Sequence, residues 1–168
     1  MSSCAANENH AASFVAALEA LSNLLTDDIE LLSVQRDQLL SNLLLIYDAT
    51  PDTVFHQVKM QFVGEPGDDL GGLTKDLYTL AWSEMMQNYF GGESAVVPQL
   101  PLYKHAEQRP HYRVIGRIIA HSTALLKTLP PRLSRCTMMC LAFGADQVSD
   151  EMLLSDFRFT LLFSIPVA

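Results

Sequence analysis

Three carboxylates, Glu65, Asp68 and Asp69, fall within one glycine-rich stretch of the sequence. Paired carboxylates can transfer protons or hold a hard cation. A calcium loop needs further oxygen ligands at alternating positions, and the residues downstream do not supply them. A phosphate-binding loop ends in Lys followed by Ser or Thr, which this stretch lacks, and its acids would repel phosphate. We therefore expect these carboxylates to hydrogen-bond backbone amides of a tight turn and to cap the helix that follows.

Two cysteines, Cys136 and Cys140, lie four residues apart in a helical pattern. Structural zinc would need two more ligands, and none follows at a zinc-like spacing. A cysteine nucleophile needs a nearby base, and the sequence places none of His105, His111 and His121 beside this pair. The pattern favours two buried free thiols and indicates no catalytic residue, no metal and no cofactor.

Basic residues are concentrated between residues 104 and 135, where a single acid, Glu107, accompanies them. They are Lys104, Arg109, Arg113, Arg117, Lys127, Arg132 and Arg135. Such a stripe can bind phosphates or an acidic partner. The chain carries a net charge of −8, so nucleic-acid binding is disfavoured. We expect a solvated helix face, or pairing with the acidic residues 1–47, and we expect His121 on that face.

The composition indicates one globular domain. The chain has 168 residues, of which 49% are hydrophobic and 18% charged, and this argues against disorder. No apolar run reaches the roughly 18 residues that a membrane span needs, and residues 1–10 lack the features of a secretory signal. Three cysteines make no disulfide framework and favour a reducing compartment. We expect a protein of the cytoplasm or nucleus that does not bind membranes.

The first half of the chain predicts helices followed by one strand. Apolar residues at three- and four-residue steps between Phe14 and Leu25 predict an amphipathic helix. Asp27 and Glu30 resemble a capping box and predict a second helix that extends to about Ile46. A loop is expected at residues 48–52. Alternation over residues 54–63 predicts a half-buried strand.

The second half predicts four helices. After a turn over residues 64–72, Thr74 is a natural N-cap for a helix that ends at Gly91 and Gly92. An irregular connection follows, and Pro110 is expected as the first residue of the next helix. Two more helices are expected at about 133–143 and after Ser149. The apolar tail, residues 157–168, is expected to pack as a terminal element or to belong to a larger fold, and it offers a surface for self-association. The expected fold class is α+β, predominantly α-helical.

The sequence FVGEPGDDLGGLTKDL, residues 62–77, resembles the signature of the HECT family of E3 ubiquitin ligases. The matching residues are Phe62, Gly64, Glu65, Gly67, Asp69, Gly71, Gly72, Lys75 and Asp76. Asp76 replaces the family's usual Glu, and Leu77 stands where the family has an aromatic residue. VQRD at residues 34–37 and YRVIGRIIA at residues 112–120 also resemble HECT segments. The resemblance covers roughly residues 30–160.

This resemblance implies a helical N-lobe, which in the family recruits the ubiquitin-loaded E2. The family's C-lobe carries the cysteine that accepts ubiquitin, and its Thr-Cys context has no counterpart in this chain. The resemblance thus implies an N-terminal tail and helix at residues 1–29 and a partial HECT-like N-lobe at residues 30–168. It implies a scaffold whose partners are an E2 or ubiquitin and whose signature residues are structural. A non-catalytic interaction module and a helical phosphate- or nucleic-acid-binding domain remain the alternatives.

Overall fold

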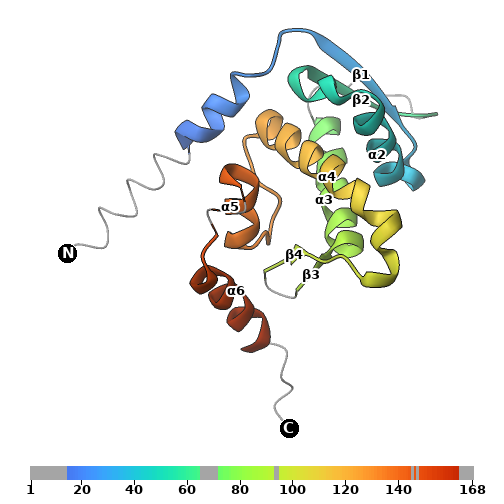
Figure 1. Cartoon of the computed structure of the whole chain (residues 1–168). Helices are drawn as coiled ribbons and strands as arrows, with labels where there is room; N and C mark the ends of the chain where they lie inside the picture. The colour runs from blue at the N-terminus through green and yellow to red at the C-terminus, as the bar shows by residue number, and fades with distance from the viewer. Residues whose placement is uncertain (1–14, 65–71, 93–94, 145, 147, 163–168) are drawn as a thin grey trace. The chain divides into compact units, whose positions relative to one another are not determined.

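The structure is a computed structural model that describes residues 15–64, 72–92, 95–144, 146 and 148–162, apart from the side chains of residues 141–143 and 157–162 (Figure 1). The chain divides into two compact units. Unit 1 comprises Met1–Tyr78 and Arg117–Leu129, and unit 2 comprises Thr79–Gly116 and Pro130–Ala168. Helices α3 (Gly72–Tyr89) and α4 (His105–Leu126) contribute residues to both units.

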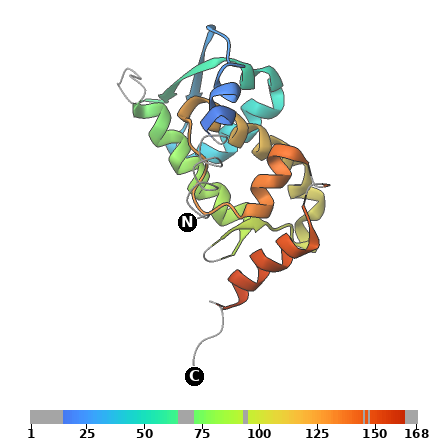
Figure 2. The ribbon, with the colours of Figure 1, turned by 90° about the vertical axis from the view of Figure 1, so that its left-hand side faces the viewer.

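Unit 1 is built on a parallel pair of strands joined by a helical crossover. Strand β1 (Ile29–Val34) pairs in register with β2 (Gln57–Phe62), so that Leu32 lies opposite Met60. The crossover consists of the 3₁₀ turn η1 (Arg36–Gln38), helix α2 (Leu39–Ala49) and the 3₁₀ helix η2 (Pro51–Phe55). Helix α2 lies beside the strands in both views (Figures 1 and 2). A helix at residues 15–22 precedes β1.

The prediction of a helix beginning at Asp27 is wrong, because β1 occupies Ile29–Val34. Leu32 and Val34 are buried while Ile29 and Leu31 are exposed, which is the alternation of a strand with one covered face. Pairing with β2 provides backbone partners that a local capping box cannot outweigh. The predicted helix therefore survives only as α2. The predicted strand at residues 54–63 is confirmed as β2, whereas the expected loop at residues 48–52 is largely helical.

Two predicted helix starts are displaced in the structure. Helix α3 begins at Gly72, so Thr74 is its third residue, with a buried side chain, rather than its N-cap. Helix α4 begins at His105, so Pro110 lies inside the helix. A proline at this position loses only the hydrogen bond to the carbonyl of Ala106, which lies in the exposed first turn. The predicted apolar side of α3 is confirmed, because Leu77, Ala81, Met85 and Tyr89 are all buried.

Unit 2 contains a short hairpin that the sequence did not predict. Strand β3 (Phe90–Gly91) pairs antiparallel with β4 (Val97–Pro98), and the 3₁₀ turn η3 (Leu102–Lys104) leads into α4. The helices predicted at about 133–143 and after Ser149 are confirmed as α5 (Arg135–Phe143) and α6 (Asp150–Leu162).

The molecule is α+β and predominantly α-helical, as the sequence predicted. Among the described residues, none of the helices is both long and apolar enough to cross a membrane.

Candidate functional site

The signature residues border a strand–turn–helix junction. Phe62 is the buried last residue of β2, and the Arg36 guanidinium carbon lies 3.9 Å from the centre of its ring. Gly64 has a φ of 83°, a conformation that side chains rarely adopt, so the chain turns there on a glycine. Gly72 opens α3, whose first turns carry the exposed Lys75 and Asp76.

The remaining signature residues lie outside the described part of the chain. They are Glu65, Gly67, Asp69 and Gly71, together with the third carboxylate, Asp68. The prediction that these acids cap the following helix therefore stays a prediction.

Unit 1 contains a chain of hydrogen bonds between buried side chains. The Tyr47 hydroxyl lies 2.6 Å from the Tyr78 hydroxyl and 2.6 Å from His121 Nδ1. His121 Nε2 lies 2.8 Å from the backbone carbonyl of His56. The three side chains are at most 1% exposed. We call Tyr78, Tyr47, His121 and the His56 carbonyl the buried hydrogen-bond chain.

The partners fix where the protons lie. The His56 carbonyl can only accept, so His121 Nε2 carries a proton and donates it. Nδ1 of the neutral ring then accepts from the Tyr47 hydroxyl, whose oxygen accepts from Tyr78. Burial lowers the pKa of His121 to about 4, which agrees with a neutral ring at pH 7. Burial also raises the pKa of both tyrosines, so neither ionises near neutrality.

This arrangement suits positioning rather than catalysis. Tyr47 belongs to α2, Tyr78 to α3 and His121 to α4, while His56 directly precedes β2. Arg117 Nη1 also donates to the Tyr47 carbonyl at 3.1 Å, next to the point where α2 ends. A general base must reach the proton that it removes, whereas both ring nitrogens of His121 are engaged and shielded from solvent. The cluster holds the strand pair and three helices of unit 1 together.

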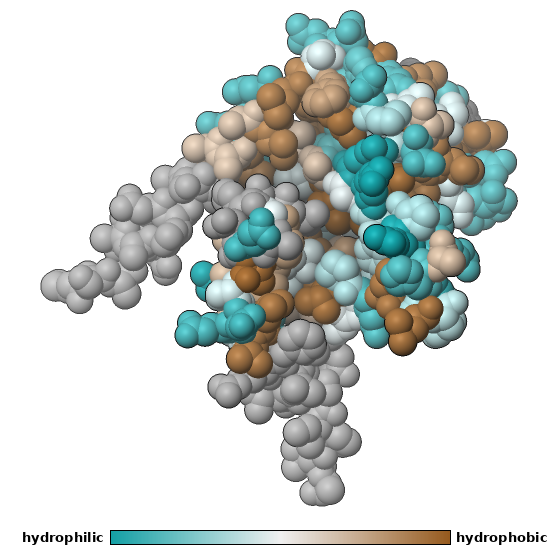
Figure 3. All heavy atoms as spheres, viewed as in Figure 1, coloured by the Kyte–Doolittle hydropathy of each residue, from teal (hydrophilic) through white to brown (hydrophobic). Residues whose placement is uncertain are grey.

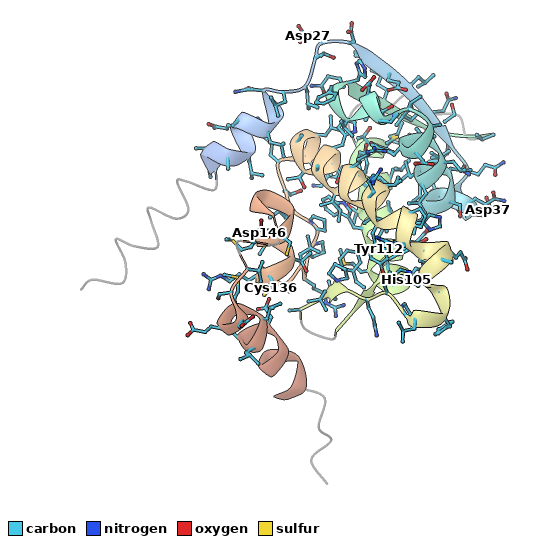
Figure 4. All side chains as sticks on the ribbon, viewed as in Figure 1. Asp27, Asp37, His105, Tyr112, Cys136 and Asp146 are labelled. Carbon is cyan, nitrogen blue, oxygen red and sulfur yellow. The ribbon has the colours of Figure 1, made fainter. Side chains whose placement is uncertain are left out.

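A second polar cluster, which includes Tyr112 (labelled in Figure 4), anchors the hairpin of unit 2. The Tyr89 hydroxyl lies 2.8 Å from His111 Nδ1. The Tyr112 hydroxyl lies 2.8 Å from the carbonyl of Tyr89 and 2.6 Å from that of Gln99. A hydroxyl has one proton, so it donates to one carbonyl at a time. This contact ties α4 to both sides of the β3–β4 hairpin.

The cysteines differ in their surroundings. Cys136 is buried, as predicted, but the prediction of a buried Cys140 is wrong, because Cys140 is exposed near the end of α5. The Cys136 amide donates to Asp156 Oδ2 at 2.9 Å, and the Ser134 hydroxyl accepts from the Thr137 amide at 3.0 Å. These two acceptors cap α5.

The surroundings of Cys136 do not make it a nucleophile. Burial and the Asp156 carboxylate raise the pKa of its thiol to about 11, so thiolate is scarce at pH 7. A pocket of about 310 Å³ adjoins it, lined mainly by apolar surface that includes Pro98 and Leu153. The described residues contain no group of three His, Cys, Asp or Glu side chains that could hold a metal ion.

The basic residues differ in their exposure and in their hydrogen-bond partners. Arg109 and Arg113 are exposed on α4, as a solvated helix face predicts. Arg117 is instead half-buried and bonded to the Tyr47 carbonyl, and Arg132 Nη2 donates to the carbonyl of Gly92 at 3.2 Å. The prediction that His121 lies on a helix face with these residues is wrong, because its side chain points into the buried hydrogen-bond chain.

Sequence reasoning missed Tyr47 and Tyr78 altogether. The available signal was position, since Tyr47 lies four residues after Leu43 and Tyr78 directly follows Leu77, both of them apolar helix positions. A tyrosine at such a position needs a partner for its hydroxyl, and a histidine in an apolar stripe is a natural one.

No protein-family model matches this chain, and no match to it was found among the curated proteins.

Proposed function

We propose that this chain forms part of the N-lobe of a HECT-type E3 ubiquitin ligase and serves there as a scaffold. What supports the proposal is the signature over residues 62–77, in which eight positions agree with the family's pattern and a ninth, Asp76, is a conservative replacement. The departure is Leu77, which stands in place of an aromatic residue. Two further segments, at residues 34–37 and 112–120, occur in the family's order along the chain.

The observation that carries the proposal is the agreement between the signature and the local fold. A motif rich in glycine calls for a sharp turn between regular elements. Phe62 ends β2, Gly64 has a positive φ, and Gly72 begins α3. A chance run of glycines within a helix or a long loop would have no such boundaries.

A scaffold role agrees with the chemistry of the described residues. Cys136 is buried and its thiol has a raised pKa, and Cys140 is exposed. The buried hydrogen-bond chain is closed to solvent and its hydrogen-bonding atoms are engaged. These features favour stability of the fold over group transfer, and a partner such as an E2 or ubiquitin would act from outside it.

Incubation with E1, a panel of E2 enzymes, ATP and ubiquitin tests the scaffold role. We expect no ubiquitin adduct that a reductant removes, in the wild type or in the Cys136→Ser and Cys140→Ser variants. A reductant-sensitive adduct that disappears in either variant would contradict the scaffold assignment, because it would identify an accepting thiol. A known HECT ligase in the same mixture provides the positive control.

A further inference from the structure

Unit 2 exposes two large apolar side chains where α4 begins. Leu102 is 92% exposed and Tyr103 is 84% exposed, and both belong to the 3₁₀ turn η3. Side chains that are this exposed bury little apolar surface within their own chain, so they contribute little to its stability. Adjacent aromatic and aliphatic side chains of this kind are typical anchors of protein interfaces.

Cationic residues continue this surface along α4. Lys104 Nζ lies 5.8 Å from the centre of the Tyr103 ring. Arg109 and Arg113 are exposed and four residues apart, so they share one face of the helix with His105. Glu107 is the one acid in this segment. Over the beginning of α4, where Figure 4 labels His105, Figure 3 shows apolar atoms projecting beside hydrophilic ones. We call Leu102, Tyr103, Lys104, Arg109 and Arg113 the basic surface.

Unit 1 carries a surface of opposite charge and similar apolar character. Asp27 and Asp28 are exposed and directly precede β1. On the uncovered face of β1, Ile29 is 60% exposed and Leu31 is 62% exposed. Lys59 lies opposite Leu31 on β2, at the end of this surface remote from the aspartates. We call Asp27, Asp28, Ile29 and Leu31 the acidic surface.

Among the described residues, no ion pair joins Arg109, Arg113, Asp27 or Asp28 to another group. Each surface combines exposed apolar side chains with charges that are mostly of one sign, and the predominant signs of the two surfaces are opposite. Charge complementarity of this kind guides association and fixes orientation, while the apolar side chains provide the buried area.

We propose that the chain self-associates, with the basic surface of one copy bound to the acidic surface of a second copy. Each copy carries both surfaces, so two identical copies can bind one another through this contact. The contact does not use the apolar tail, and it is independent of the ligase assignment. A contact through the tail would be insensitive to charge, whereas this one depends on it.

Two charge-reversed variants of the full chain test the contact by sedimentation velocity at low salt. The first is Arg109→Glu with Arg113→Glu, and the second is Asp27→Lys with Asp28→Lys. We expect the wild type to exceed the monomer mass as concentration rises. Each variant alone places like charges face to face, and we expect its association to weaken at least about tenfold. In an equimolar mixture of the two variants, each surface of one variant meets a surface of opposite charge on the other, so we expect association to return.

A control and a salt series complete the experiment. Lys127→Glu with Arg135→Glu changes the net charge as much as the first variant does, at exposed residues outside both surfaces, and we expect this control to associate like the wild type.

A salt series tests the role of charge. Raising NaCl from 0.1 to 0.5 M shortens the screening length from about 10 Å to less than half that distance, so we expect the wild-type contact to weaken. The proposal is overturned by a wild type that stays monomeric, by variants that associate like the wild type, or by a mixture that stays monomeric. Circular dichroism confirms that each variant is folded.

Discussion

The hydroxyl of Tyr47 donates to Nδ1 of His121 across 2.6 Å, within the buried core of unit 1. These residues are 74 positions apart in the sequence, and they join α2 to α4. Through Tyr78 and the His56 carbonyl, the same bonds reach α3 and the segment before β2. The elements that border the signature turn thus share one set of buried hydrogen bonds.

Removal of the His121 side chain is expected to destabilise the protein by about 3 kcal/mol. His121→Ala removes the acceptor for the Tyr47 hydroxyl and the donor to the His56 carbonyl, and it opens a cavity. Urea denaturation measures the loss. The control is His105→Ala at an exposed position, which we expect to stay within about 0.5 kcal/mol of the wild type. Equal losses in the two variants would show that the buried hydrogen-bond chain contributes nothing.

Removal of the Tyr47 hydroxyl is expected to lower the stability of the protein more than removal of the Tyr78 hydroxyl. Tyr47→Phe removes an acceptor for Tyr78 and a donor for His121, and we expect a loss of about 2–3 kcal/mol. Tyr78→Phe removes only the terminal donor, because Tyr47 still donates to His121, and we expect about 1 kcal/mol. Thermal and urea unfolding of both variants provide the comparison. A larger loss of stability for Tyr78→Phe than for Tyr47→Phe would contradict the assignment in which Tyr78 donates to Tyr47 and Tyr47 donates to His121.

Stability is expected to fall in mild acid because of His121. The ring titrates near 6.5 in the unfolded chain, and burial lowers its pKa to about 4 in the folded state. The unfolded state therefore binds the proton first, so stability is complete above pH 6.5 and decreases as the pH falls toward 4. The total loss is about 3 kcal/mol.

A variant separates this effect from the titration of carboxylates. His121→Gln keeps a donor and an acceptor but does not titrate. We expect the difference in unfolding free energy between wild type and variant to shrink steadily from pH 7 to pH 4. A difference that stays constant over that range would exclude His121 as the origin.

The two cysteines of α5 are expected to react at different rates. Cys140 is exposed, whereas Cys136 is buried with its pKa raised to about 11. Alkylation of the native protein at pH 7.5, followed by peptide mapping, should modify Cys140 at least about tenfold faster. In Cys140→Ser the Cys136 peptide should stay slow until denaturant is added. Fast modification of Cys136 in the native state would contradict the burial that the structure gives it.

The glycines that border the signature turn are expected to respond differently to alanine. Gly64 has a φ of 83°, so Gly64→Ala should cost about 1–2 kcal/mol. Gly72 has no positive φ and lies in the first turn of α3 with space around it, so Gly72→Ala should leave stability unchanged or slightly higher. Urea denaturation of both variants distinguishes them. Equal losses of stability in the two variants would mean that backbone conformation does not explain the glycine at position 64.

Local patterns predicted the elements that depend on their own sequence. Leu77 to Tyr89 gave the buried side of α3, and the Ser149-capped helix was confirmed as α6, where the Met152 amide donates to the Ser149 hydroxyl at 3.2 Å. Strand β1 was missed because its pairing with β2 is 28 residues away, so that Asp27 and Glu30 could satisfy a helix pattern locally.

The buried hydrogen-bond chain was beyond sequence reasoning for a related reason. His121 looked like a surface residue because it lies four positions after Arg117. The burial of His121 depends on the crossover that places α2 beside α4, and the spacing of residues along α4 carries no information about this contact. The hairpin β3–β4 was missed because each strand has only two residues, too few for an alternating pattern.

The central claim is that this chain supplies part of a HECT-type N-lobe. The most direct test replaces the corresponding segment of an active HECT ligase with residues 30–160 and measures the ubiquitin thioester formed on the ligase's own cysteine. We predict that the chimera still forms the thioester and that the destabilising Tyr47→Phe change reduces its yield. A chimera that is folded by circular dichroism, binds no charged E2 and forms no thioester would contradict the claim.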